Sequence, residues 1–128
     1  MYTYVLVAAG GALGSTFRYW LGGLIANWVG QTFPWGTLVI NVTGSFVIGL
    51  FATLTGPDGR VFVPGEWRQF FIIGVCGGYT TFSSFSLQTL ALARDGEMMW
   101  AGMNIGLSVA LSLLGVWLGH AGAMLLND

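Results

Sequence analysis

The sequence predicts an all-α integral membrane protein with four transmembrane helices, and composition, run length and helix breakers all lead to that class. Hydrophobic residues make up 55% of the 128 residues and charged residues only 7%, whereas a soluble domain carries about 25% charged residues. Four cations and five anions are too few to cover a water-soluble fold of this size. The composition therefore excludes a soluble enzyme, a nucleic-acid-binding protein and a disordered chain.

Four apolar runs are long enough to cross a bilayer, which takes about 20 residues. They cover about 4–29, 35–55, 67–93 and 98–126. Glycine and proline signals separate them, most clearly at 56–59, and none of the runs alternates as a barrel strand would. Because the spans use most of the chain, we expect one transmembrane domain over 1–128. We expect a multi-pass protein of the cell membrane, either a plasma membrane or a bacterial inner membrane.

The third span contains a segment that disfavours a continuous helix. Between Gly74 and Thr81 there are three glycines and two threonines. A break at membrane depth is tolerated where it is buried in protein or lines a cavity. Its freed carbonyls could hold a cation, and a simple kink packed on a neighbouring helix accounts for the same pattern equally well.

Small residues and charges indicate how the helices assemble. Pairs of glycines four residues apart, which let helix backbones approach closely in lipid, occur at 10/14, 74/78, 102/106 and 115/119. With four spans, both termini and the middle loop share one side. That side holds Arg60 and Arg68, and the other side holds Arg94. Two against one is a weak bias, so either another feature sets the orientation or the chain inserts both ways, which would permit an antiparallel dimer.

Uncharged polar residues form a stripe on each of three spans. The spacing of three or four residues places each set on one helix face: Thr37, Asn41 and Ser45; Thr81, Ser84 and Gln88; and Asn104, Ser108 and Ser112. Polar groups inside a membrane are functional candidates because lipid disfavours them. These stripes are either hydrogen-bonding contacts between helices or the wall of a polar pathway.

The charge inventory favours an anion on such a pathway. No Asp or Glu lies well inside a span, and the one charge deep in a span is Arg18. Cation pores and proton-coupled transporters commonly need an intramembrane carboxylate. Asn and Ser can donate to an anion, although they also coordinate cations, and the ring edges of Phe82 and Phe85 carry positive partial charge. The residues favour a small anion without identifying it.

Three other functions are weaker. A proton-coupled exporter of organic cations lacks its carboxylate. An intramembrane hydrolase would need an acid partner for His120, which stands at the far end of the fourth span. A non-transporting scaffold, in which the polar stripes only hold helices together, would be electrically silent in a bilayer.

Three segments together resemble the Fluc family of fluoride channels. They are Gly-Gly-Ala-Leu-Gly-Ser-Thr-Phe-Arg-Tyr at 10–19, Pro-Trp-Gly-Thr-Leu-Val-Ile-Asn-Val-Thr-Gly-Ser-Phe at 34–46, and Gly-Val-Cys-Gly-Gly-Tyr-Thr-Thr-Phe-Ser-Ser-Phe-Ser at 74–86. The resemblance covers all four spans. It implies a fluoride-selective channel, not an enzyme, through which fluoride leaves the cytoplasm passively. It also implies an antiparallel, dual-topology homodimer in membrane lipid, with two pores and a structural sodium ion at its centre.

The resemblance also implies roles for individual residues. Phe82 and Phe85 would line the pores with their ring edges, and Gly77 and Thr80 would bind sodium through backbone carbonyls. The remaining candidates for the fluoride pathway are Asn41, Thr37, Ser108, Ser112, Thr81, Ser84, Gln88 and, near a pore entrance, Arg18. Two positions depart from the family pattern. Gln88 stands where a glutamate is common, and Asn104 where an aromatic residue or histidine is more usual.

Overall fold

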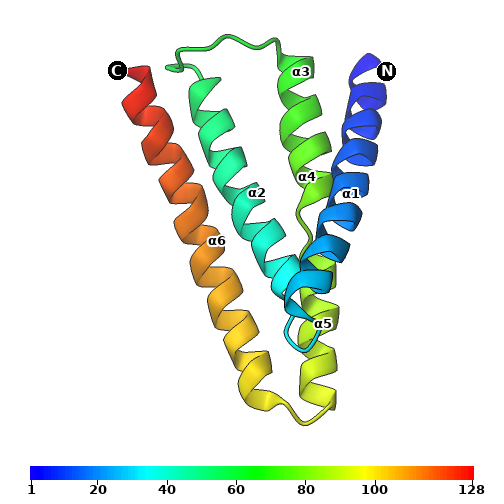
Figure 1. Ribbon diagram of the computed structural model, residues 1–128. Coiled ribbons are helices and arrows are strands. Elements are labelled where there is room, and N and C mark those ends of the chain that lie inside the picture. Colours follow the sequence, from blue (N-terminus) through cyan, green and yellow to red (C-terminus); the bar gives the residue numbers. More distant parts are fainter.

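The computed structural model describes all residues, 1–128, and is entirely helical (Figure 1). Its elements are α1 (Tyr2–Val29), α2 (Trp35–Leu54), α3 (Gly65–Gln69), the π-helical segment η1 (Phe70–Cys76), α4 (Gly77–Tyr79), α5 (Phe82–Arg94) and α6 (Met98–Asn127). The last turn of α1 ends at Gly30, whose φ of 85° suits glycine. The connections between these helices lie at 30–34, 55–64 and 95–97, and the second contains the breaker predicted at 56–59.

Three helical segments are long and apolar enough to cross a membrane: α2, the run Gly65–Arg94 and α6. They correspond to the second, third and fourth predicted spans. The helix α1 has 28 residues, about 42 Å at 1.5 Å per residue, but it is not among the three apolar candidates. The multi-pass membrane class is confirmed, and the count of four spans stays a prediction.

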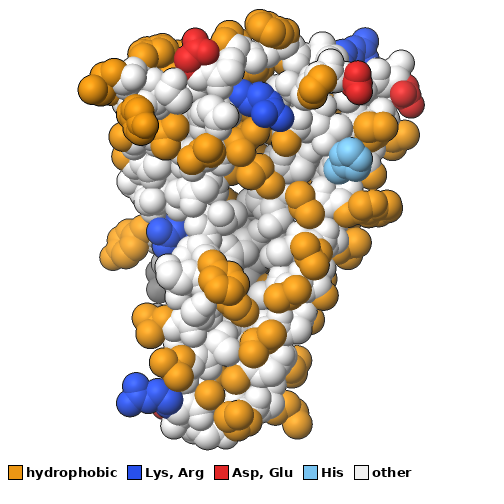
Figure 2. All heavy atoms as spheres, turned by 180° about the vertical axis from the view of Figure 1, so that it is seen from behind, with side chains coloured by type: hydrophobic (Ala, Val, Ile, Leu, Met, Phe, Trp, Pro, Cys, Tyr) orange, Lys and Arg blue, Asp and Glu red, His pale blue; other side chains and the backbone are white.

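Both termini and the connection between α2 and α3 lie at one end of the bundle (Figure 1). The α5–α6 turn lies at the opposite end, and the α1–α2 turn stops short of it. The helix α2 packs along α6, while α1 packs against η1 and α4. Charged side chains gather at the two ends, with one basic group about halfway along, and apolar side chains cover much of the rest (Figure 2). This distribution suits a bundle surrounded by lipid.

Glycines allow close backbone contact at two seams. A Cβ on Gly14 would lie 2.8 Å from the Tyr79 nitrogen, and one on Gly78 would lie 2.7 Å from the Gly11 oxygen. On the α2–α6 seam, a Cβ on Gly115 would lie 3.0 Å from the Val42 oxygen. These contacts confirm three of the predicted glycine pairs as packing sites. The pair at 102/106 meets nothing within 4 Å, so the prediction of tight packing within the chain is wrong there.

The third span is broken, as predicted, but the break falls after the glycines. Gly77 remains helical, whereas Thr80 (φ −82°, ψ 160°) and Thr81 (φ −153°, ψ 119°) are extended. Gly74 and Gly78 serve the contact with α1, where a side chain would meet its backbone. The chain therefore leaves the helix at the two β-branched threonines, which have low helix propensity.

Candidate functional site

Asn41 on α2 holds the break in place by pairing with one residue of it. The Asn41 Nδ2 donates to the Thr81 oxygen at 2.9 Å, and the Thr81 N–H donates to the Asn41 Oδ1 at 2.7 Å. In a continuous helix this N–H would donate to the Gly77 carbonyl. The side-chain amide thus substitutes for a lost turn of helix. One Nδ2–H of Asn41 remains uncommitted, because an amide nitrogen carries two hydrogens.

A residue of the break, Thr81, caps the first turn of the helix that follows. The Oγ1 of Thr81 accepts from the Ser84 N–H at 3.1 Å, so Thr81 is the N-cap of α5. On the other side, the carbonyl of Gly78 accepts from the Arg18 Nε at 3.1 Å and from the Ser15 hydroxyl at 3.4 Å. The charge that the sequence placed deep in the first span therefore lies beside the break.

A hollow of about 450 Å³ lies against the break, and we call it the break hollow. It brings together eight of the predicted site residues: Asn41, Gly77, Thr80, Thr81, Phe82, Phe85, Ser108 and Ser112. Ser45 of the predicted α2 stripe also lines it, and no charged side chain does. The Phe82 and Phe85 rings lie 5.4 Å apart between centroids, at 51° to each other. Phe82 is 77% exposed and Phe85 only 8%, so one ring stands on the surface and the other is fixed by packing.

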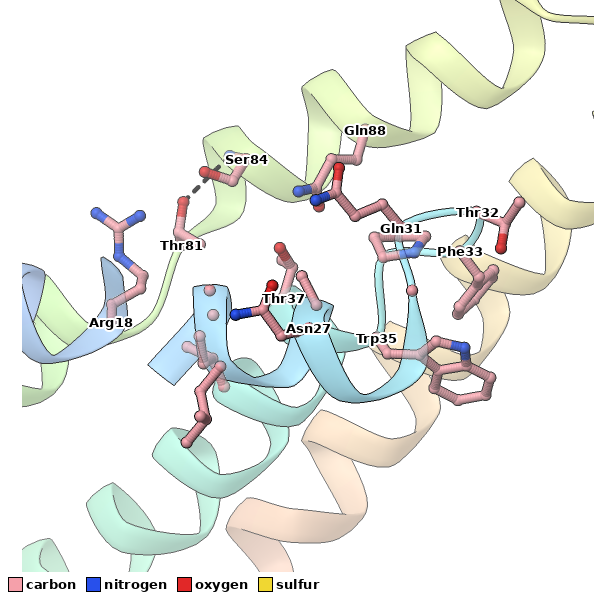
Figure 3. Close-up of a pocket in the computed structure, with 18 of the residues that line it drawn as sticks. Arg18, Asn27, Gln31, Thr32, Phe33, Trp35, Thr37, Thr81, Ser84 and Gln88 are labelled. Atoms are coloured by element: carbon pink, nitrogen blue, oxygen red, sulfur yellow. Dashed lines mark hydrogen bonds between the residues drawn. The ribbon is translucent and has the colours of Figure 1, made fainter. Parts of the chain in front are cut away.

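A second hollow, of about 830 Å³, is drawn in Figure 3, and we call it the wide hollow. It holds the remaining predicted residues, Arg18, Thr37, Ser84 and Gln88, and shares Thr81 with the break hollow. Figure 3 shows Arg18 at one end of it and Gln88 beside Gln31 at the other. The Oε1 of Gln88 is buried without a hydrogen-bond partner. The amide of Gln88 therefore has one unpaired acceptor in the wide hollow.

The three polar residues of the fourth-span stripe do not share one role. Asn104 is 1% exposed, and its Nδ2 donates to the Thr89 Oγ1 at 2.9 Å while its Oδ1 accepts from Ser108 at 3.2 Å. Asn104 therefore ties α6 to α5 and lines neither hollow. Of the two readings that the sequence left open, contact between helices holds for Asn104, while Ser108 and Ser112 line the break hollow.

Several polar residues outside the predicted stripes line the wide hollow or bond to each other across α2 and α6. Asn27, Gln31 and Thr32 line the wide hollow from the end of α1 and the following turn. In the sequence, only their position at the end of an apolar run indicated that they could line a polar surface. Thr53 and His120, which bond to each other at 2.8 Å, continue the α2 and α6 stripes at four-residue spacing, and that spacing could have located them.

The chain matches the family model described as CrcB-like protein, Camphor Resistance (CrcB), over residues 5–120. It is 73% identical over 126 residues to a protein of Rhodospirillum rubrum, covering 98% of each chain. It is 66% identical over 127 residues to one of Paramagnetospirillum magneticum, covering 99% of each, and 58% identical to one of Opitutus terrae, covering 100% of this chain and 97% of the relative. All three relatives bear the name fluoride-specific ion channel FluC.

Proposed function

The chain belongs to the CrcB-like family, and from that premise we propose that it is a fluoride-specific ion channel and not an enzyme. The observation that carries the proposal is the break hollow. It combines uncharged donors with two aromatic rings and contains no carboxylate. Such a lining can replace the hydration of a small anion and offers a cation no fixed negative charge.

Fluoride would pass the break by moving between hydrogen-bond donors and ring edges. The second Nδ2–H of Asn41 and the Ser112 hydroxyl have no partner within the chain, so they are free to donate to an anion. The edges of Phe82 and Phe85 add positive partial charge beside them. Thr81 lines both hollows, which supports a pathway that continues to Thr37, Ser84, Gln88 and Arg18.

The transport is passive efflux. Hydrogen fluoride enters a cell as a neutral acid and ionises in the cytoplasm. A negative-inside membrane potential then drives the anion outward, by about 2.3 kcal/mol per charge per 100 mV. Reduced fluoride toxicity follows without any energy-consuming step.

The break also offers carbonyls that fit a sodium ion. The Gly77 carbonyl loses its helical donor because the Thr81 N–H donates to Asn41, and the Thr80 carbonyl accepts no hydrogen bond. Carbonyl oxygens of a broken helix are suitable ligands for Na⁺. When bound, the ion would supply positive charge near the anion pathway, and Gly77 and Thr80 would hold it.

Two features support an antiparallel homodimer of four-span chains. The break hollow opens on the molecular surface with Phe82 mostly exposed, so a second chain is needed to complete its wall. Arg60 and Arg68 at one end are nearly balanced by Arg94 at the other, which gives little preference for one orientation.

Fluoride efflux from liposomes tests the proposal directly. Purified protein is reconstituted, and fluoride release is followed with a fluoride electrode. Liposomes without protein and liposomes loaded with chloride serve as controls. Rapid fluoride release with negligible chloride release is expected. Well-folded protein that releases no fluoride would leave a scaffold as the function.

The dual topology is tested with one thiol. In the variant Cys76→Ser combined with Asp128→Cys, the only cysteine lies at the C-terminus. A membrane-impermeant maleimide added to intact cells should label roughly half of these chains, and the rest only after permeabilisation. Labelling of all or none from outside would mean a single orientation.

A further inference from the structure

The break hollow adjoins a third hollow nearer the end of the bundle where the termini lie, and we call the two together the groove. The third hollow, of about 540 Å³, shares Ile48 with the break hollow. Its other lining residues are Gly49, Ala52, Thr53, Val116, Trp117 and His120. On α2 the series 45, 49, 53 and on α6 the series 112, 116, 120 advance by four residues, so each series stays on one face. The polar stripes thus end at Thr53 and His120.

The hydroxyl of Thr53 is hydrogen-bonded differently from those of Thr43, Thr55 and Thr89. Thr43, Thr55 and Thr89 each donate to the carbonyl four residues earlier, at 2.8 Å, which is how a hydroxyl in a membrane helix is normally satisfied. The only partner of the Thr53 Oγ1 is the Nδ1 of His120, at 2.8 Å. A hydroxyl and an imidazole are therefore held together at the edge of the groove.

Protonation of the imidazole changes what this pair can donate. In neutral histidine one ring nitrogen is a donor and the other an acceptor. In the cation both nitrogens are donors, so Nδ1–H must donate to the Thr53 oxygen. The hydroxyl hydrogen of Thr53 then turns away from the ring, and Nε2–H is also free. The protonated pair presents two donors and one positive charge.

No carboxylate opposes this charge in the third hollow. The helix α2 has no ionisable side chain, and within α6 His120 is the only one. From α3, Arg68 donates to the Ala52 carbonyl and to Thr55. From the α2–α3 connection, Arg60 donates to the Leu126 carbonyl. Both are cations. The carboxylates at this end of the bundle are those of Asp58, Glu66 and Asp128 with the C-terminus, and none of them lines the third hollow.

From these contacts we propose that Thr53 and His120 form an anion site at the mouth of the groove, and that it binds fluoride more strongly when His120 is protonated. The inference rests on the proposed channel function, because it assigns the ion that arrives there. A small anion that accepts strong hydrogen bonds fits two convergent donors beside a cation. Imidazole is the side chain whose charge changes between pH 5 and 8, so proton concentration would regulate fluoride capture.

The first test observes the site itself. His120 is the only histidine of the chain, so tag-free protein gives a single set of imidazole NMR signals. At a fixed pH near 7, sodium fluoride should move these signals toward the protonated form, because ligand and proton binding are linked. Sodium gluconate should not, and Thr53→Val should reduce the effect. Absence of a fluoride-specific shift would overturn the proposal.

The second test measures fluoride current in planar bilayers at equal pH on both sides, with fluoride below saturation. Current in the wild type should rise between pH 8 and pH 6, on the order of severalfold. His120→Gln should remove the rise. The matched control combines His120→Gln with Leu118→His, which returns an imidazole at similar depth on an exposed position that lines neither hollow. The fluoride current of this double variant should also be independent of pH.

A wild-type current that is independent of pH, or the same rise in His120→Gln, would refute the site and leave the channel function intact. If the wild type conducts no fluoride at any pH, the channel function fails, and the NMR shift alone then decides whether the anion site exists.

Discussion

Replacement of Asn41 separates the structural role of this side chain from its role in conduction. Two variants of nearly the same shape are compared, Asn41→Leu and Asn41→Asp. The leucine removes both hydrogen bonds to Thr81 and leaves its N–H without an acceptor. An unpaired donor that is cut off from water costs about 1–3 kcal/mol, so this variant should be less stable than the wild type. The aspartate still accepts from the Thr81 N–H, but its second oxygen faces the Thr81 carbonyl, so two acceptors meet and this variant is destabilised too.

The two variants should differ more in conduction than in stability. A carboxylate that lines the break hollow would stand about 4 Å from a passing fluoride ion, where two like charges repel by about 4 kcal/mol at an effective dielectric constant of 20. That energy corresponds to about a thousandfold lower rate. Asn41→Leu adds no charge, and it loses only a donor and some rigidity of the break. Efflux should therefore decrease in the order wild type, Asn41→Leu, Asn41→Asp.

Fluoride efflux from liposomes gives the rates, and thermal unfolding in detergent followed by size-exclusion chromatography gives the stability order. Wild-type efflux from Asn41→Asp would refute the assignment of Asn41 to the pathway. Equal efflux from the two variants would show that no anion passes close to this side chain.

Three further variants test other parts of the molecule. Phe82→Ile and Phe85→Ile should each slow fluoride efflux by about twofold to tenfold, the equivalent of a lost ring-edge contact. Phe85→Ile should also lower thermal stability by about 1–3 kcal/mol, because Phe85 is buried within the chain. Gly14→Ala should disrupt the α1 seam and reduce the yield of monodisperse protein, whereas Gly11→Ala, whose Cβ meets nothing within 4 Å, should be tolerated. Arg18→Gln, which can still donate to the Gly78 carbonyl, should keep the fold and slow efflux by about twofold or more through loss of charge.

Each expectation has a distinct contradicting result. Normal efflux from both phenylalanine variants would remove the rings from the pathway. Equal yields of the Gly14→Ala and Gly11→Ala proteins would mean that the α1 seam can open without cost. A collapse of folding in Arg18→Gln would make the arginine a structural residue first.

The sequence determined the class of the protein and where its helices are interrupted. Scarcity of charge, apolar runs and glycine–proline breakers are properties of the chain itself, because lipid selects for apolar residues and internally bonded backbone wherever the chain crosses. The composition of segment 74–81 also predicted that the third span is broken. The motifs at 10–19, 34–46 and 74–86 indicated the fluoride-channel family, and the comparisons confirmed that membership.

Only the tertiary structure decided which neighbour each polar face meets. Helical spacing groups Asn104 with Ser108 and Ser112, yet Asn104 faces Thr89 and is buried, while the two serines line the break hollow. The break falls at Thr80 and Thr81 because the glycines before it are needed against α1. Periodicity fixes a face of one helix, but the partner of that face depends on how separate helices pack, and local sequence carries little information about that packing.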